Sequence, residues 1–158
     1  MNKFLALIAI LYLNCAVAKN IEPLNNHSLE EFFTNEKAGH TVLERCVSLY
    51  SAITELTRTK YPDLASEFYQ IANTLYPYGI ISLSKTQNIS YEDAEKFFYT
   101  NVNNLANLYI DEMKKNGEKN GSYFKLSFIG DDLRFCHEVT KSFNLVISDL
   151  NNEELNNE

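Results

Sequence analysis

Residues 40–60 read HTVLERCVSLYSAITELTRTK, and this stretch decides the fold class of the chain. At about 100° per residue, counted from Val42, its apolar positions all fall between about −40° and 100°. These positions are Leu43, Cys46, Leu49, Tyr50, Ile53 and Leu56. The polar positions Glu44, Arg45, Ser48 and Glu55 lie outside this arc. The spacing predicts a long helix with one buried stripe and a solvated face, ended before Pro62.

Three further stretches have helical spacing and recognisable helix starts. A helix from Pro62 is predicted because proline suits the first helical position and Asp63 suits the positive end of the dipole. A longer helix is predicted over residues 91–115, started by Ser90 and ended at Gly117. The last predicted helix runs to Leu150 with Asp131 as its cap. The predicted inner faces comprise Leu64, Phe68, Ile71, Ala72 and Leu75, then Tyr91, Ala94, Phe98, Val102, Leu105, Leu108, Tyr109 and Met113, then Phe135, Cys136, Val139, Phe143, Val146, Ile147 and Leu150.

Short or interrupted segments connect these helices. Ser28 and Glu31 form a capping box that predicts a short leading helix to about residue 37, ended by Gly39. Pro77 is expected to kink or end the second long helix, after which residues 80–85 continue as a short helix or as a strand without a partner. The polar residues 114–122 are expected to form a mobile loop, and residues 123–129 an extended segment or a helical turn.

These elements predict an all-α protein, an antiparallel bundle of four main helices with a short leading helix, crosslinked by one disulfide. The predicted domain spans residues 28–150. A flexible leader, residues 19–27, precedes it, and an acidic, Asn-rich tail, residues 151–158, follows it.

The first 18 residues have the pattern of a secretory signal peptide. Lys3 precedes an apolar run that closes on Ala-Val-Ala, so cleavage is expected after Ala18. The run is shorter than the roughly 20 residues of a transmembrane helix. Cys15 raises the alternative of a lipoprotein, but the residues before it do not fit the lipidation pattern. We therefore expect export, to a periplasm or to the outside of the cell, with no stable membrane insertion once the signal is removed.

Composition and charge narrow the classes of function. The chain has 158 residues, of which 45% are hydrophobic and 22% charged, as in a folded globular domain. Removal of Lys3 with the signal leaves 13 Lys+Arg against 21 Asp+Glu, a formal charge of −8. This charge makes nucleic acid and anionic membranes poor partners.

Cys46 and Cys136 are the two cysteines that remain after the predicted cleavage. Each lies in the apolar stripe of a long helix, and an even pair in an exported protein favours a structural disulfide. A redox-active pair is the alternative, although such pairs are typically two residues apart at a helix N-terminus. A metal site that adds His40 and His137 is disfavoured, because neither pair of ligands is spaced three or four residues apart.

No catalytic or cofactor motif is present in the sequence. The leading hypothesis is a non-catalytic exported protein that binds a protein partner or a small ligand, with Tyr69, Phe97 and Tyr99 as a possible interaction surface. The alternative is a secreted or periplasmic enzyme, a hydrolase or a metal-handling protein. Its site would be assembled from scattered residues such as His40, Glu44 and Asp132.

Overall fold

The chain forms an all-α bundle of four long helices and a short leading helix, as predicted. The computed structural model describes residues 21–155, so the predicted signal peptide, including Cys15, lies outside the described residues. No strand occurs in residues 21–155, and none of the helices described there is long and apolar enough to cross a membrane. The elements are η1 (Leu24–Asn26), α1 (Leu29–Thr34), α2 (Glu36–Thr57), α3 (Pro62–Gln87), α4 (Tyr91–Asn120) and α5 (Phe128–Leu155).

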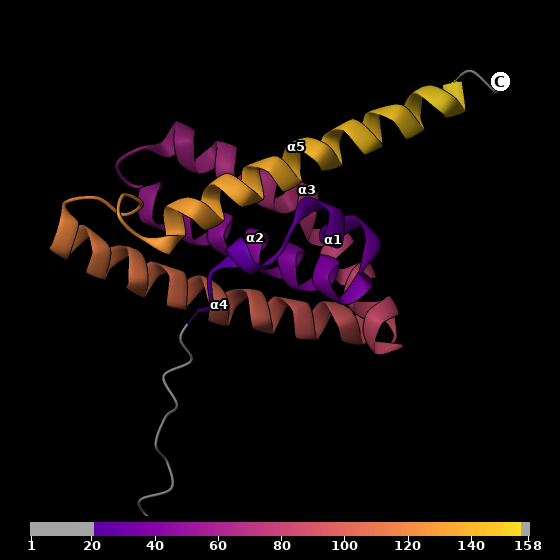
Figure 1. Cartoon of the computed structure of the whole chain (residues 1–158), viewed down its shortest axis with the longest axis horizontal. Helices are drawn as coiled ribbons and strands as arrows, with labels where there is room; N and C mark the ends of the chain where they lie inside the picture. Colours follow the sequence, from indigo (N-terminus) through magenta and orange to yellow (C-terminus); the bar gives the residue numbers. More distant parts are fainter. Residues whose placement is uncertain (1–20, 156–158) are drawn as a thin grey trace, which may run out of the picture.

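Helix α2 is the centre of the bundle, with contacts to α1, α3, α4 and α5 (Figure 1). It is therefore buried around most of its circumference rather than along one stripe. The prediction of a solvated face for Arg45 and Ser48 is wrong, since their exposed fractions are only 8% and 0%. A helix covered from several sides has to satisfy any polar side chain by internal contacts.

The boundary between the leading helix and α2 lies earlier than predicted. Ser28 caps α1, as expected, by accepting a hydrogen bond from the Glu31 amide at 3.1 Å. Helix α1 ends before Asn35, whose side chain starts α2 by accepting from the backbone amides of Lys37 and Ala38. Gly39 is therefore inside α2 and does not end the leading helix.

Helix α3 continues through Pro77. Of the two predicted effects of this proline, a kink or an end of the helix, the end is wrong. A proline removes one backbone hydrogen bond, and α3 keeps its helical path despite this loss while packing against α2 and α4. Gly79, two residues later, serves a close approach between helices: a Cβ atom at this position would lie 2.2 Å from Cζ of the buried Phe98 in α4. The helix ends at Asn88, in the left-handed conformation with φ of 52°.

Helix α4 is longer than predicted and includes most of the segment expected to be a loop. Gly117 lies inside α4, where a Cβ atom would be 2.8 Å from the Tyr123 ring, so this glycine allows the returning chain to pack closely. The side-chain amide of Asn116 donates to the carbonyl oxygens of Ser122 and Lys125, at 2.6 and 2.9 Å. Gly121, with φ of 69°, ends the helix instead.

Helix α5 begins at Phe128, so Asp131 lies in its first turn and is not its cap. The helix also continues to Leu155, beyond the predicted domain end, and its last part extends away from the other helices (Figure 1). Three positions predicted to face the core are exposed, two in the first turns of α3 and α4 and one in the part of α5 that extends away from the other helices. These are Leu64, Tyr91 and Val146, with exposed fractions of 41%, 50% and 47%.

Candidate functional site

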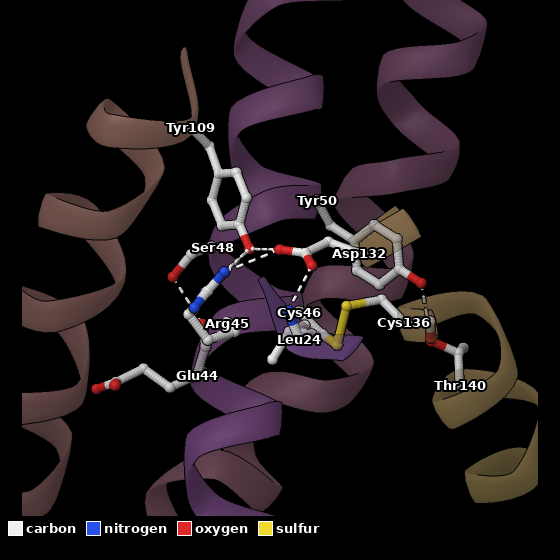
Figure 2. The surroundings of a disulfide bond; sticks show 10 residues. All are labelled: Leu24, Glu44, Arg45, Cys46, Ser48, Tyr50, Tyr109, Asp132, Cys136 and Thr140. Atoms are coloured by element: carbon white, nitrogen blue, oxygen red, sulfur yellow. Dashed lines mark hydrogen bonds and ion pairs between the residues drawn. A yellow bond between two sulfur atoms is a disulfide. The ribbon is translucent and has the colours of Figure 1, made fainter. Parts of the chain in front are cut away.

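The predicted disulfide between Cys46 and Cys136 is present and joins α2 to α5 (Figure 2). Both cysteines have an exposed fraction of 0%, and their Cα atoms are 5.3 Å apart. Burial of both sulfurs denies access to a second thiol, which a redox-active pair needs. The position of this disulfide therefore supports a structural role.

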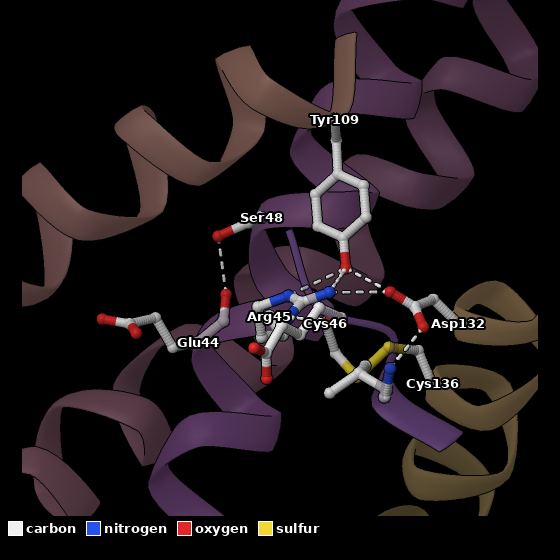
Figure 3. Close-up of polar contacts among 9 residues, drawn as sticks. Glu44, Arg45, Cys46, Ser48, Tyr109, Asp132 and Cys136 are labelled. Atoms are coloured by element: carbon white, nitrogen blue, oxygen red, sulfur yellow. Dashed lines mark hydrogen bonds and ion pairs between the residues drawn. A yellow bond between two sulfur atoms is a disulfide. The ribbon is translucent and has the colours of Figure 1, made fainter. Parts of the chain in front are cut away.

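A buried polar network lies beside the disulfide and was not predicted from the sequence (Figure 3). The carboxylate of Asp132 accepts hydrogen bonds from the Tyr109 hydroxyl at 2.6 Å, from Arg45 Nη2 at 2.8 Å and from the backbone amide of Leu24 at 2.7 Å. Arg45 also donates from Nε and Nη2 to the Tyr109 oxygen and from Nη1 to the carbonyl oxygen of Glu22. The network thus ties α2, α4, α5 and the segment before α1 together.

Burial sets the protonation of this network. Burial raises the pKa of Tyr109, an effect that Arg45 partly opposes and Asp132 reinforces. The Tyr109 hydroxyl therefore stays protonated. It donates a hydrogen bond to Asp132 and accepts hydrogen bonds from Arg45. Burial also raises the pKa of Asp132, while its hydrogen bonds to Tyr109 and Leu24 and the Arg45 charge act in the opposite direction. All oxygens of the network have partners, which is the arrangement of a structural ion pair.

Residues 19–27 were predicted to form a flexible leader. The described part of this segment, before α1, is instead packed against the bundle. Leu24 has an exposed fraction of 1% and belongs to the hydrophobic core. Its amide and the Glu22 carbonyl are held by Asp132 and Arg45. Leu24, the two backbone contacts and the partly buried Ile21 hold this short segment against the bundle.

The residues of the alternative enzyme hypothesis do not converge on one site. His40 is buried, and its ring lies 6.3 Å from the Phe98 ring, between α2 and α4. Glu44 points away from Asp132, whose carboxylate is engaged in the ion pair (Figure 3). The disulfide consumes both thiols of the disfavoured metal site, and no cluster of three or more potential ligands occurs within the described part of the chain.

The buried His40 is expected to make the stability of the protein sensitive to acid. Burial lowers the pKa of His40 from 6.5, and the Glu44 charge only partly opposes this effect. Below pH 6.5 the unfolded chain binds a proton at this site more readily than the folded chain does. The free energy of unfolding therefore decreases as the pH is lowered, by at most about 1.4 kcal/mol per pH unit. Urea unfolding between about pH 7 and pH 5 should show a smaller decrease in the free energy of unfolding for His40→Leu than for the wild type. His137→Gln, which changes an exposed histidine, should keep the wild-type dependence, and an unchanged slope in His40→Leu would contradict the assignment.

The predicted interaction residues Tyr69, Phe97 and Tyr99 are all exposed, with exposed fractions of 57%, 59% and 61%. Phe97 and Tyr99 are two positions apart on α4, so their side chains leave the helix about 200° apart. Tyr69 lies on α3. The structure leaves their side chains free at the surface but does not direct Phe97 and Tyr99 toward one partner.

A groove of about 280 Å³ lies between α1, the start of α2, α3 and α5. Four aromatic rings line it, and two pairs of rings pack edge to face with centroids 4.7 and 4.5 Å apart. These rings are Phe32, Phe33, Tyr78 and Phe143. Phe33 is 50% exposed, and Ile81, which also lines the groove, is 41% exposed. The groove therefore presents large apolar side chains to solvent.

The shape of the groove depends on residues from several elements. Gly39 contributes only backbone, because a Cβ atom there would lie 2.9 Å from the carbonyl oxygen of Phe32. From α3, Tyr78, Ile81 and Lys85 occupy one helix face, at the spacing of three and four residues that defines such a face. This face was not recognised in the sequence because Pro77 was expected to interrupt the helix.

Three other surface hollows, of about 540 to 620 Å³, are larger than the groove. The hollow between α2 and α4 is lined mostly by polar or charged residues, and the one at the start of α5 by polar and apolar residues in similar number. The third, around the end of α4, contains three aromatic residues, Tyr61, Tyr123 and Phe124, and is also largely apolar. The groove brings together four aromatic rings and two aliphatic side chains, Leu43 and Ile81, from four helices, the largest apolar set in any of these hollows, so it is the best candidate despite its smaller volume. No protein-family model, curated protein or solved structure matches this chain, and the groove is therefore interpreted from its own geometry.

Proposed function

We propose that the chain is a non-catalytic exported protein that binds a protein partner outside the cytoplasm through the groove. The observation that carries this proposal is the exposure of Phe33 and Ile81 around a hollow lined by aromatic rings. Exposed apolar side chains gathered in one place are typical of interaction sites. The disulfide and the predicted signal peptide support export, since disulfides persist in oxidising compartments.

The exposure of Phe33 and Ile81 in the lining of the groove favours a protein partner over an enclosed small ligand. Pockets that enclose a ligand usually measure about 300 to 1,000 Å³. An open groove of about 280 Å³ instead fits a few apolar side chains projecting from a partner surface. Lys85 and Glu36, which also line the groove, would then contact the polar rim of that partner.

An apolar fluorescent probe tests whether the groove is an accessible binding site. Anilinonaphthalene sulfonate should gain fluorescence with the folded, oxidised protein at low concentration, because the exposed rings offer it an apolar surface. Ile81→Glu should reduce this gain severalfold, since it places a charge in the groove at a partly exposed position. Circular dichroism would confirm that the variant stays folded.

Phe97→Glu is the matched control. It introduces the same charge at an exposed aromatic residue that does not line the groove, so it should bind the probe like the wild type. Equal fluorescence for Ile81→Glu and the wild type, or no gain with the wild type, would reject the groove as the contact site.

A further inference from the structure

The loop between α4 and α5 carries an unusually exposed apolar side chain. Leu126 has an exposed fraction of 88%, more than any other large apolar residue whose side chain the structure describes. The loop lies at one end of the bundle, and the outer part of α5 extends toward the opposite end (Figure 1). A single exposed leucine is ordinary on a protein surface, so the backbone that holds it is the more informative observation.

The backbone holds Leu126 in a conformation that costs free energy. Its φ of 60° lies in the left-handed region, which glycine and asparagine adopt readily and leucine does not. The preceding residue is fixed by two side chains: Asn116 donates to the Lys125 carbonyl oxygen at 2.9 Å, and the Ser122 hydroxyl accepts from the Lys125 amide at 3.1 Å. Strained residues held by a well-fixed surrounding are concentrated at functional sites. The loop therefore presents Leu126 to solvent on a braced backbone.

Positive charge surrounds this loop in a chain that is otherwise acidic. Residues 113–130 carry four lysines and one glutamate, a formal charge of +3, whereas the whole chain has −7. Arg134, which lines the same hollow as Leu126, is neutralised by its ion pair with Asp131. Three lysines form no ion pair within the part of the chain that the structure describes, and these are Lys114, Lys119 and Lys125.

Two exposed tyrosines lie at the same end of the bundle. Tyr61, which precedes α3, is 52% exposed and Tyr123 is 40% exposed, and both line one hollow together with Lys114. Tyrosine and lysine side chains have an apolar body and a polar end. Tyrosine is enriched where the headgroups of a bilayer meet its acyl chains, and lysine is attracted to anionic headgroups.

We propose that this end of the bundle makes reversible contact with a membrane surface rich in anionic phospholipid. Leu126 enters the apolar layer, while the lysines and tyrosines stay at the level of the headgroups. We call this set the loop tip, and it comprises Tyr61, Lys114, Lys119, Tyr123, Lys125 and Leu126. A bilayer fits the loop tip better than a protein does, because a projecting leucine among unpaired lysines needs no cavity of matching shape in a deformable, diffusely charged surface.

The net charge of the chain does not prevent this contact. Helix α4, with 30 residues, extends about 45 Å away from the loop tip. Exposed charges are largely screened beyond about 8 Å at physiological ionic strength. Most of the acidic remainder is therefore too distant to repel a surface that meets the loop tip. The expectation that anionic membranes are poor partners follows from the total charge and overlooks this asymmetry.

Sedimentation with lipid vesicles tests the proposal on the mature, oxidised protein. The wild type should sediment with vesicles of equal parts phosphatidylglycerol and phosphatidylcholine at about 0.05 M salt, and much less at about 0.5 M salt. It should sediment weakly with phosphatidylcholine alone, because the lysines then lack an anionic surface. Lys125→Glu should weaken binding about tenfold or more, whereas Lys141→Glu, at an exposed lysine outside the loop tip, should weaken it less.

Leu126→Asn tests the apolar contact without endangering the fold. Asparagine adopts the left-handed conformation at lower cost than leucine, so the melting temperature should be equal to that of the wild type or higher. Vesicle binding should nevertheless fall about tenfold, since the inserted side chain is lost. Leu145→Asn is the matched control: Leu145 is also exposed, at 60%, but lies on α5 outside the loop tip, so binding should persist.

A tryptophan reports insertion directly, because the chain contains none. The emission of Leu126→Trp should shift to shorter wavelength with the anionic vesicles, whereas the emission of Leu145→Trp should not. A wild type that binds neither kind of vesicle, a Leu126→Asn variant that binds like the wild type, or an unshifted emission from bound Leu126→Trp would overturn the proposal. Absent vesicle binding together with a protein complex that needs Leu126 would instead identify the loop tip as a protein-docking element. The groove takes no part in this contact, so these results leave the proposed function unaffected.

Discussion

Replacement of Asp132 by alanine is expected to lower the free energy of unfolding by about 3 to 5 kcal/mol. Asp132 has an exposed fraction of 0%, and its carboxylate is the shared acceptor for Arg45, Tyr109 and the Leu24 amide. Its removal leaves the buried Arg45 charge without a counter-ion and deprives the segment before α1 of one backbone contact. Urea unfolding at neutral pH, followed by circular dichroism, measures the loss.

Asp131 provides the matched control for this prediction. It is the preceding residue, and it pairs with Arg134 at 3.3 Å on the surface of α5, with a side chain that is 55% exposed. Asp131→Ala should therefore cost less than about 1 kcal/mol. Arg45→Met combined with Asp132→Leu should recover much of the loss seen in Asp132→Ala, because no buried charge then remains unpaired. A cost for Asp132→Ala as small as that for Asp131→Ala would show that the network contributes little.

The helical architecture was predictable because apolar spacing and helix caps are local signals. The stripe from Val42 to Leu56 identifies α2, and Ser28 and Ser90 mark true helix starts, each accepting a hydrogen bond from an amide of the first turn. The disulfide was predictable for the same reason, since both cysteines occupy helix faces that have to be buried. Local patterns that agree with the tertiary packing are reliable guides to the fold.

The errors come from residues whose role depends on distant partners. Gly117 was predicted to end a helix. It instead lies inside α4, where the absence of a side chain allows the Tyr123 ring to pack closely. Pro77 was expected to kink or end the helix, yet α3, which packs against α2 and α4, is continuous through it. The burial of Arg45 follows from the central position of α2. Its one sequence signal is that Glu44 and Arg45 are the only charged residues between positions 41 and 54.

The groove was not predictable from any single segment, because four helices contribute to it. Phe143 and Ile81 belong to separate amphipathic patterns, and nothing local indicates that their faces converge. The aromatic residues chosen from sequence, Tyr69, Phe97 and Tyr99, are exposed as expected for surface residues. Their role as an interaction surface stays a prediction, and loss of partner binding on their replacement would support it.

Removal of the disulfide by the double replacement Cys46→Ala and Cys136→Ala is expected to lower the free energy of unfolding by about 2 to 4 kcal/mol. The bond closes a loop with a sequence separation of 90, so the reduced unfolded chain gains considerable conformational freedom. Far-UV helical content should remain nearly unchanged below the melting transition, because the apolar faces of all four long helices survive. Thermal and urea unfolding of the variant and of the oxidised wild type provide the comparison.

The same variant separates a structural crosslink from thiol chemistry. Intact mass with and without reduction should show that the native protein carries no free thiol at Cys46 or Cys136, and two freely alkylated cysteines would contradict the crosslink.

Because both sulfurs are buried, a thiol reductant should reach them only when α2 and α5 separate, so reduction should be slow until denaturant is added. No cysteine lines the groove, although Leu43 and Phe143, which do, lie about one and two helical turns from Cys46 and Cys136. Binding of the fluorescent probe at low temperature should therefore persist in the double variant, and its loss with the helical content intact would instead make the disulfide part of the binding function.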